Sequence, residues 1–164
     1  MSIQTTSPER SAKRQRGFVY ASITIRNRAD DVRLGEGLIA PSDVRTLELE
    51  RVLVDTGAST LALPAPMIAT LGLELIEEVI VDTATGSYPT RMYRDASLTV
   101  GGRMGDFRCL ELPADAQPLL GVLPMEELGV EPDVIAHELR FLPRGEGGKS
   151  HIFLMGHSFL STSE

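Results

Sequence analysis

The sequence predicts a mostly β protein whose short strands have the spacing of a small sandwich or closed barrel. Two observations support this prediction. Several segments alternate apolar and polar residues with the period of two that turns one face of a strand toward a core, and clusters of glycine, proline and small polar residues separate these segments. The length of 164 residues suits one domain with a real core and is too short for two comfortable ones.

The N-terminal part begins with two expected strands. Residues 18–27, FVYASITIRN, alternate apolar and polar positions, and residues 28–43 form a charged stretch with glycine and proline that we expect to be a loop. Residues 45–54, RTLELERVLV, alternate at first and then become continuously apolar, as in a strand that passes from the surface into the core. Residues 64–73 have proline at the start and Gly72 near the end, which predicts one or two helical turns.

The middle of the chain predicts two hairpins. Residues 74–94, ELIEEVIVDTATGSYPTRMYR, contain two apolar-rich runs around a turn at residues 84–87. Residues 96–113, ASLTVGGRMGDFRCLELP, contain two further runs that meet at Gly101 and Gly102. We therefore expect two antiparallel strand pairs in succession.

The C-terminal part predicts a strand, a helix and a last strand. Residues 118–130, PLLGVLPMEELGV, begin as an apolar strand, break at Gly121 and continue as a short helix around residues 125–128. Residues 136–143, AHELRFLP, alternate again and predict another strand. The sequence contains no internal repeat.

The two ends of the chain differ from this central region. Residues 1–16 are polar without periodicity, so we expect a disordered N-terminal arm. The domain is expected to span residues 17–144, followed by a linker and tail at 145–164. The arm contains Lys13, Arg14 and Arg16. No aromatic residue lies between them, so a solvated arm is favoured over a patch for nucleic acid or an anionic surface.

Composition excludes several classes of protein. The formal net charge of -7 argues against nucleic acid as the main partner. No apolar run approaches the length of a membrane helix, and the N-terminus has no apolar segment typical of a secretory signal, so we expect no membrane association. The single cysteine, Cys109, rules out an internal disulfide framework, which fits a reducing cytoplasm.

The segment VLVDTGASTLALP, residues 52–64, raises a physical question. An apolar run delivers Asp55 to the end of a buried strand, directly before a Thr-Gly turn. A carboxylate in such a place is costly unless it is hydrogen-bonded or shares a proton. On the tripeptide alone we would favour an ordinary turn aspartate that accepts hydrogen bonds from its own backbone.

The order of motifs along the chain reverses that preference. The segment around Asp55 resembles the apolar-Asp-Thr-Gly-Ala-Ser pattern of the retroviral-type, or retropepsin-like, aspartic peptidases, particularly their small prokaryotic members. The resemblance continues through LGLEL at 71–75, VIVDTATGSYPTRMY at 79–93 in the position of the flap hairpin, and LLGVLPMEELGVEPD at 119–133. It covers about residues 17–143.

The resemblance implies a small closed acid-protease barrel with a flap hairpin, one or two short helices and no cofactor. Chains of this family work as two-fold dimers, so Asp55 would face Asp55 of a second copy and share one proton with it. The unprotonated carboxylate would activate a water that attacks a peptide bond, and the protonated one would polarise the carbonyl. Only one Asp-Thr-Gly is present. Asp82-Thr83 comes closest to a second, but Ala84 replaces the glycine.

The resemblance also assigns roles to the neighbours of Asp55. Thr56 would hydrogen-bond across the dimer axis, with a simple turn hydroxyl as the alternative, and Gly57 would let the backbone approach the substrate. Ala58 and Ser59 would line the cleft floor, with Ser59 also supporting the Asp55 carboxylate. The flap would fold over the peptide, and an ordinary exposed hairpin is the competing interpretation. Its expected substrate-binding residues are Thr83, Ala84, Thr85, Gly86 and Ser87.

Two functions follow from the sequence. The first is a homodimeric aspartic endopeptidase acting on peptides or proteins, and the second is a non-catalytic dimer of the same fold that binds peptides or serves in assembly. The intact loop at Asp55 favours the first. The polar flap tip, unlike the Gly-rich apolar tip of the viral enzymes, keeps the second open. The viral enzymes carry Arg-Asn where this chain has Val122-Leu123, so the dimer contacts made there are expected to differ. The three histidines lack metal-ligand spacing, so no metal site is expected.

Overall fold

The computed structural model describes residues 17–145 and 147. Its strands are β1 (Val19–Asn27), β2 (Thr46–Val54), β3 (Leu61–Pro64), β4 (Glu74–Thr83), β5 (Gly86–Val100), β6 (Arg103–Leu112), β7 (Leu119–Leu120), β8 (Val130–Asp133) and β9 (Glu138–Phe141). Its helices are α1 (Arg28–Gly35), α2 (Ala65–Leu71) and α3 (Val122–Leu128), with one turn of 3-10 helix at Pro41–Asp43. The predicted arm at 1–16 and most of the predicted tail lie outside the described residues.

Six strands close into a ring. Neighbours along the sheet follow the order β1-β2-β7-β3-β6-β5, and residues 24–27 of β1 pair with residues 96–99 of β5 to complete the circle. The pairs β2–β7 and β3–β6 are parallel and the other pairs are antiparallel. The predicted closed, barrel-like sheet is therefore confirmed, with mixed rather than purely antiparallel strands.

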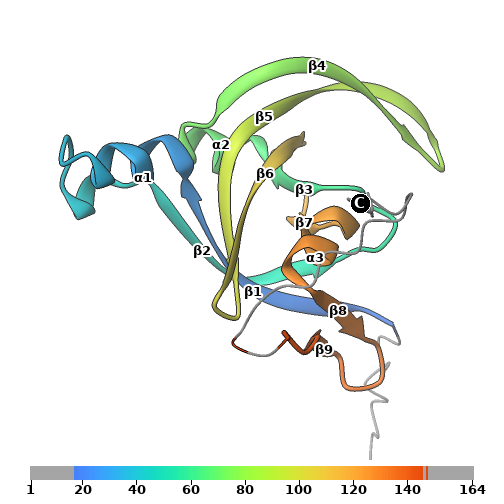
Figure 1. Ribbon diagram of the computed structural model, residues 1–164. Helices are drawn as coiled ribbons and strands as arrows, with labels where there is room; N and C mark the ends of the chain where they lie inside the picture. Colours follow the sequence, from blue (N-terminus) through green and yellow to red (C-terminus); the bar gives the residue numbers. More distant parts are fainter. Residues whose placement is uncertain (1–16, 146, 148–164) are drawn as a thin grey trace, which may run out of the picture.

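Both predicted hairpins are present. The β4–β5 hairpin turns at residues 84–85, and β4 pairs only with β5, so this hairpin extends from the ring as a long curved arm (Figure 1). The β5–β6 hairpin turns at Gly101 and Gly102, whose φ angles of 52° and 79° favour glycine. The arm has the position expected for a flap.

The mainly β fold is confirmed, and the described residues contain three short helices where one or two were expected. The two predicted helices, α2 and α3, end at Gly72 and Gly129, both in the left-handed conformation. Residues 28–35 were expected to be a loop but form α1. The Asn27 side chain caps α1 by accepting hydrogen bonds from the backbone of Ala29 and Asp30, at 2.8 and 3.2 Å.

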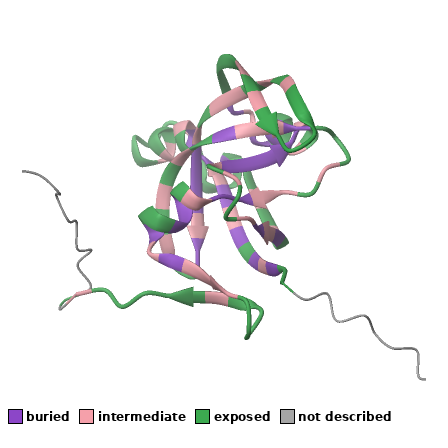
Figure 2. Cartoon of the chain, turned by 90° about the vertical axis from the view of Figure 1, so that its right-hand side faces the viewer, coloured by how far each residue is buried: buried purple, intermediate pink, exposed green. Residues whose placement is uncertain are grey.

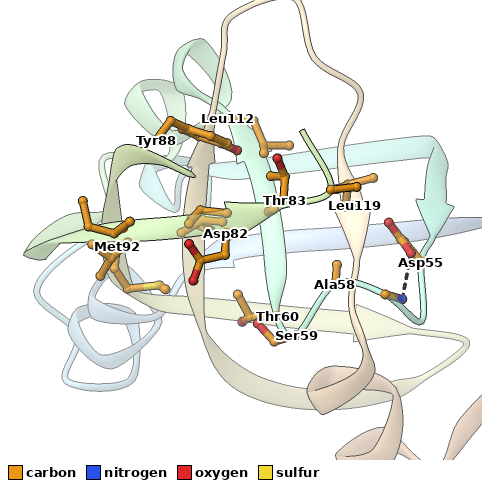
Figure 3. Close-up of a pocket in the computed structure, with 17 residues that line it drawn as sticks. Asp55, Ala58, Ser59, Thr60, Asp82, Thr83, Tyr88, Met92, Leu112 and Leu119 are labelled. Carbon is orange, nitrogen blue, oxygen red and sulfur yellow. Dashed lines mark hydrogen bonds between the residues drawn. The ribbon is translucent and has the colours of Figure 1, made fainter. Parts of the chain in front are cut away.

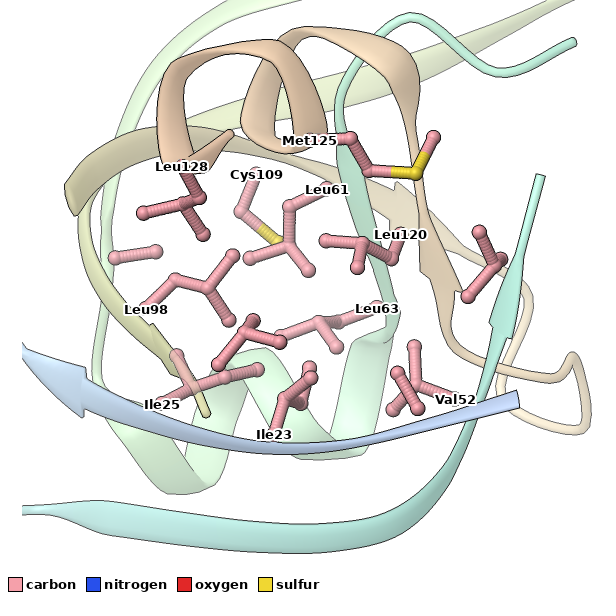
Figure 4. Packing of buried hydrophobic residues seen from close by; sticks show 14 of the residues in the cluster. Ile23, Ile25, Val52, Leu61, Leu63, Leu98, Cys109, Leu120, Met125 and Leu128 are labelled. Carbon is pink, nitrogen blue, oxygen red and sulfur yellow. The ribbon is translucent and has the colours of Figure 1, made fainter. Parts of the chain in front are cut away.

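The core fills the inside of the ring. Figure 4 shows α3 over one end of this core, and Figure 2 shows the buried residues concentrated along the strands of the ring. Cys109 belongs to this core, as the sequence indicated, and its burial raises the pKa of the thiol to about 12. The largest completely buried side chains include Ile25, Leu61, Leu63, Leu71, Leu98 and Leu120.

A second sheet of two strands, β8 and β9, lies outside the ring. Arg103 of β6 ties it to the barrel, because its guanidinium donates hydrogen bonds to the carbonyls of Leu128, Gly129 and Leu142 at 2.9, 2.5 and 2.5 Å. The last predicted strand corresponds to β9, whereas β8 was not predicted as a strand. Within residues 17–145, no helix is long and apolar enough to cross a membrane.

Candidate active site

Asp55 stands at the end of β2, where a parallel neighbour fixes the backbone. Leu53 N–H donates to the carbonyl of Pro118 and Asp55 N–H donates to that of Leu120, both at 3.0 Å. Residues 53–54 pair with residues 119–120 of β7. The main chain is therefore hydrogen-bonded to the neighbouring strand as far as Asp55, and this fixes the point from which the carboxylate extends.

The segment that follows β7 holds the other side of the loop. Val122 N–H donates to Ala58 O at 2.8 Å, and Leu123 N–H donates to Ser59 O at 3.0 Å. Gly121 lies so close to the loop that a methyl group on it would come within 2.6 Å of Thr60 N and 2.7 Å of Ala58 O. The loop of residues 55–60 is consequently held by main-chain contacts at its start and along its second half.

The Asp55 side chain has few partners. Its Oδ1 accepts a hydrogen bond from Gly57 N–H at 2.8 Å, and Asp55 O accepts one from Ala58 N–H at 3.1 Å. Asp55 is partly buried, whereas Thr56, Gly57 and Ser59 are exposed. Among the described residues no hydrogen bond joins Ser59 to Asp55, so the expected support by Ser59 is not observed in the single chain. Within residues 17–145 the hydrogen bond from Gly57 N–H uses only part of the hydrogen-bonding capacity of the carboxylate.

A cleft of about 680 Å³ opens between this loop and the β4–β5 flap (Figure 3). Of the predicted site residues, the cleft is lined by Asp55, Gly57, Ala58, Ser59, Thr83 and Ala84, and not by Thr56, Thr85, Gly86 or Ser87. The apolar walls of the cleft were not predicted from the sequence, although the alternation in β4, β5 and β6 was a signal that indicates them. These walls include Val79, Val81, Tyr88, Met92, Leu110, Leu112 and Leu119.

The flap tip is closed by its own hydrogen bonds. The Thr83 hydroxyl donates to Gly86 O at 2.7 Å and accepts from Thr85 N–H at 3.3 Å. The Ser87 hydroxyl donates to Asp82 Oδ1 at 2.5 Å. Gly86 has a backbone φ angle of 136°, which residues other than glycine rarely adopt. The polar groups of the tip thus bond to one another.

The base of the flap is fixed to the ring by polar contacts that the sequence did not indicate. Where β5 leaves the ring, the Tyr93 hydroxyl donates to Glu111 Oε2 at 2.6 Å and the Thr90 hydroxyl donates to Glu111 O at 2.7 Å. Burial and the neighbouring Glu111 carboxylate raise the pKa of Tyr93. These contacts anchor the arm at one end and leave its tip to extend over the cleft.

Comparison with protein families identifies this arrangement. The sequence model of an aspartyl protease family matches residues 38–129 of the chain. The chain belongs to the retropepsin-like aspartyl proteases. The matched range contains the loop at Asp55, the whole flap and α3. The family predicted from the motifs in these segments is therefore confirmed. That the chain belongs to the prokaryotic branch of the family stays a prediction. No curated protein sequence gives a significant match.

One further carboxylate lines the cleft of this aspartyl protease family member. Asp82 belongs to β4, and Figure 3 shows it near the middle of the view, with Asp55 at the right. Asp82 accepts a hydrogen bond from the Ser87 hydroxyl. Within the described residues no hydrogen bond joins Asp82 to Asp55. Among the same residues no cluster of His, Cys, Asp or Glu has the arrangement of a metal site.

Proposed function

We propose that the protein is an aspartic endopeptidase that acts as a homodimer. The observation that carries this proposal is the position of Asp55, which lies at a peptide-sized cleft on a loop fixed by main-chain hydrogen bonds. Among the described residues its carboxylate accepts a single hydrogen bond, from Gly57 N–H. A sequence with one Asp-Thr-Gly supplies one such carboxylate. A second copy would supply the other.

The chemistry follows from two carboxylates in contact. At a separation of about 3 Å both cannot ionise, and the pair shares one proton. The ionised Asp55 would take a proton from a water as it attacks the peptide carbonyl, and the protonated Asp55 of the second copy would donate a hydrogen bond to the carbonyl oxygen. As the C–N bond of the peptide breaks, the first Asp55 passes the proton that it took from the water to the nitrogen of the leaving amine. The pair then again holds one shared proton, as at the start.

The neighbouring residues are suited to the remaining tasks. Thr56 and Gly57 are exposed next to Asp55 and could contact the same loop of a second copy. Ala58 and Ser59 border the cleft, where an extended peptide would hydrogen-bond to main-chain groups. The flap, with Thr83 and Ala84 at the cleft and Thr85, Gly86 and Ser87 at the tip, would cover the peptide and exclude water. The apolar walls favour apolar side chains beside the cleaved bond.

Replacing Asp55 tests the chemistry. Asp55→Asn should lower kcat/KM by about 10³ or more, because neither base nor acid can then be formed at the dyad. The measurement is cleavage of a proteome-derived peptide library followed by mass spectrometry. Asp82→Asn is the matched control, since it removes the second carboxylate of the same cleft and should retain activity within a few-fold. Cleavage that survives in Asp55→Asn would refute the proposed mechanism.

The dimer has a separate test. Analytical ultracentrifugation at micromolar concentration should detect a species of twice the 17.8 kDa chain mass, with a larger dimer fraction when a peptide-like inhibitor is present. A single 17.8 kDa species under both conditions would remove the second carboxylate and with it the proposal.

A non-catalytic peptide-binding or assembly dimer is the second candidate. The observation that favours it is the flap tip, whose hydroxyls and carboxylate already bond to one another and offer few free groups to a substrate. This candidate predicts a dimer that retains peptides without cutting them. Binding without cleavage by the wild-type protein would select it over the peptidase.

A further inference from the structure

A second groove continues from the cleft along the outside of α3. It has a volume of about 500 Å³ and shares Ser59, Thr60 and Met92 with the cleft. Its other lining residues are Asp106, Phe107, Arg108, Leu123, Glu126 and Glu127. A peptide lying in the cleft can therefore extend into this groove without leaving the surface.

Part of the groove wall is apolar and could contact the aliphatic part of a long side chain. Met92, Phe107 and Leu123 line it, and Leu123 is 56% exposed. Gly105 makes room for this arrangement, because a methyl group there would lie 2.7 Å from Phe107 Cζ and 3.2 Å from Glu127 Oε1. The absence of a side chain at Gly105 thus lets an aromatic ring and a carboxylate lie together.

The charges of the groove are unbalanced. Three carboxylates and one guanidinium line it. Asp106 pairs with Arg28 at 3.2 Å, and Arg108 pairs with Glu77 at 3.4 Å. Glu126 and Glu127, both exposed, have no ion-pair partner among the described residues.

Two further features of α3 bear on this charge. The last turn of the helix contains no basic residue. The nearby Arg103 is engaged with the main-chain carbonyls of Leu128 and Gly129. The groove therefore presents two carboxylates whose charge no basic side chain of the described chain neutralises by direct contact.

We propose that this groove is a distal subsite that binds a lysine or arginine side chain of the peptide substrate. The aliphatic stem of such a residue would lie against Met92, Phe107 and Leu123, and its cationic end would reach Glu126 and Glu127. Apolar side chains would fit the walls but leave the carboxylates unpaired, and acidic side chains would be repelled. The inference rests on the proposed peptide-binding function and adds a charge preference to it.

The test compares two double variants that remove the same charge. Glu126→Gln/Glu127→Gln alters the groove, and Glu48→Gln/Glu50→Gln alters two exposed glutamates on β2 that have no ion-pair partner among the described residues. The probe is a proteome-derived library cut after glutamate, so that lysine and arginine remain inside the peptides. Wild-type cleavage should show about a fivefold enrichment of Lys and Arg at one position away from the cut bond.

The enrichment should disappear in the groove variant, persist in the β2 variant and decrease in 0.5 M NaCl, because exposed charge pairs are screened by salt. An enrichment that survives in the groove variant, or no enrichment at any position, overturns the subsite.

Capture of the same library on immobilised Asp55→Asn protein separates this outcome from a failure of the peptidase proposal. If the wild type cuts nothing, Lys and Arg enrichment among the captured peptides still supports the groove. A captured set without such enrichment, or no captured peptide, overturns it.

Discussion

Two aspartates of this molecule are held in contrasting ways, and only one of them lines the cleft. Asp30 is 3% exposed and accepts three hydrogen bonds from Arg45, from its N–H, Nε and Nη2 at 3.1, 2.7 and 2.8 Å. Asp55 is partly exposed at the cleft and accepts one hydrogen bond, from Gly57, among the described residues. The Arg45 guanidinium holds the pKa of Asp30 below its ordinary value, although burial acts in the opposite direction.

The two aspartates belong to regions that are held together differently. Around Asp30, side chains join the elements: Asn27 caps α1 and also donates to the carbonyls of Leu71 and Gly72 at 2.8 and 3.1 Å, which links α1 to the end of α2. Around Asp55, main-chain hydrogen bonds and the close approach of Gly121 hold the loop. The backbone supplies the rigidity there, and among the described residues the carboxylate takes part in one hydrogen bond, with Gly57 N–H.

The largest expected effect on stability comes from a side chain at Gly121, where the main chain of two segments is in close contact. Gly121→Ala should lower the free energy of unfolding by about 3 kcal/mol and kcat/KM by about a hundredfold, because the new methyl group meets backbone atoms that cannot move without displacing Asp55. Chemical denaturation and peptide-cleavage assays measure the two effects. Gly35→Ala is the control, since nothing lies within 4 Å of a methyl group there. Equal stabilities for the two variants would contradict the role of Gly121.

A smaller effect is expected from the Asp30 network. Asp30→Asn should lower the free energy of unfolding by about 2 kcal/mol, because the hydrogen bonds from the Arg45 guanidinium lose their charged acceptor. Asp55→Asn should not lower it, since its carboxylate has a single main-chain partner within the described chain. Urea denaturation at one protein concentration compares the two variants. A larger loss of stability in Asp55→Asn would contradict this contrast between the two aspartates.

The smallest effect is the pH dependence of the same pair. The hydrogen bonds from Arg45 hold the native-state pKa of Asp30 below its ordinary value. The contribution of Asp30 to stability is therefore present above the unfolded-state pKa of about 4 and is lost as the pH falls through the native-state pKa. The stability difference between the protein with Asp30 and the Asp30→Asn variant should therefore shrink below pH 4. Both proteins should carry Asp55→Asn, so that cleavage at acid pH does not interfere. A difference that grows on acidification would contradict this account of Asp30.

Local patterns in the sequence determined most of the strands, the turns and helix ends, and the family motif of this protein. Alternation identified β1, β2 and the two hairpins, and Gly101-Gly102 identified the β5–β6 turn. Gly72 and Gly129 marked the ends of two helices, because each supplies the left-handed conformation that ends a helix. The motif around Asp55, with the later motifs in order, indicated the family that the comparison confirmed. These features depend on neighbouring residues, so a linear sequence displays them.

Tertiary structure decided what depends on residues far apart in the chain. Helix α1 lacks a marked apolar face, and Asp30 within it pairs with Arg45, fifteen residues away. The ring closes through β1 and β5, and the Asp55 loop is fixed by contacts with residues 118–123. The second groove combines α3 with β6 and the Asp55 loop. Such pairings are selected by packing of the whole chain, and no local pattern records them.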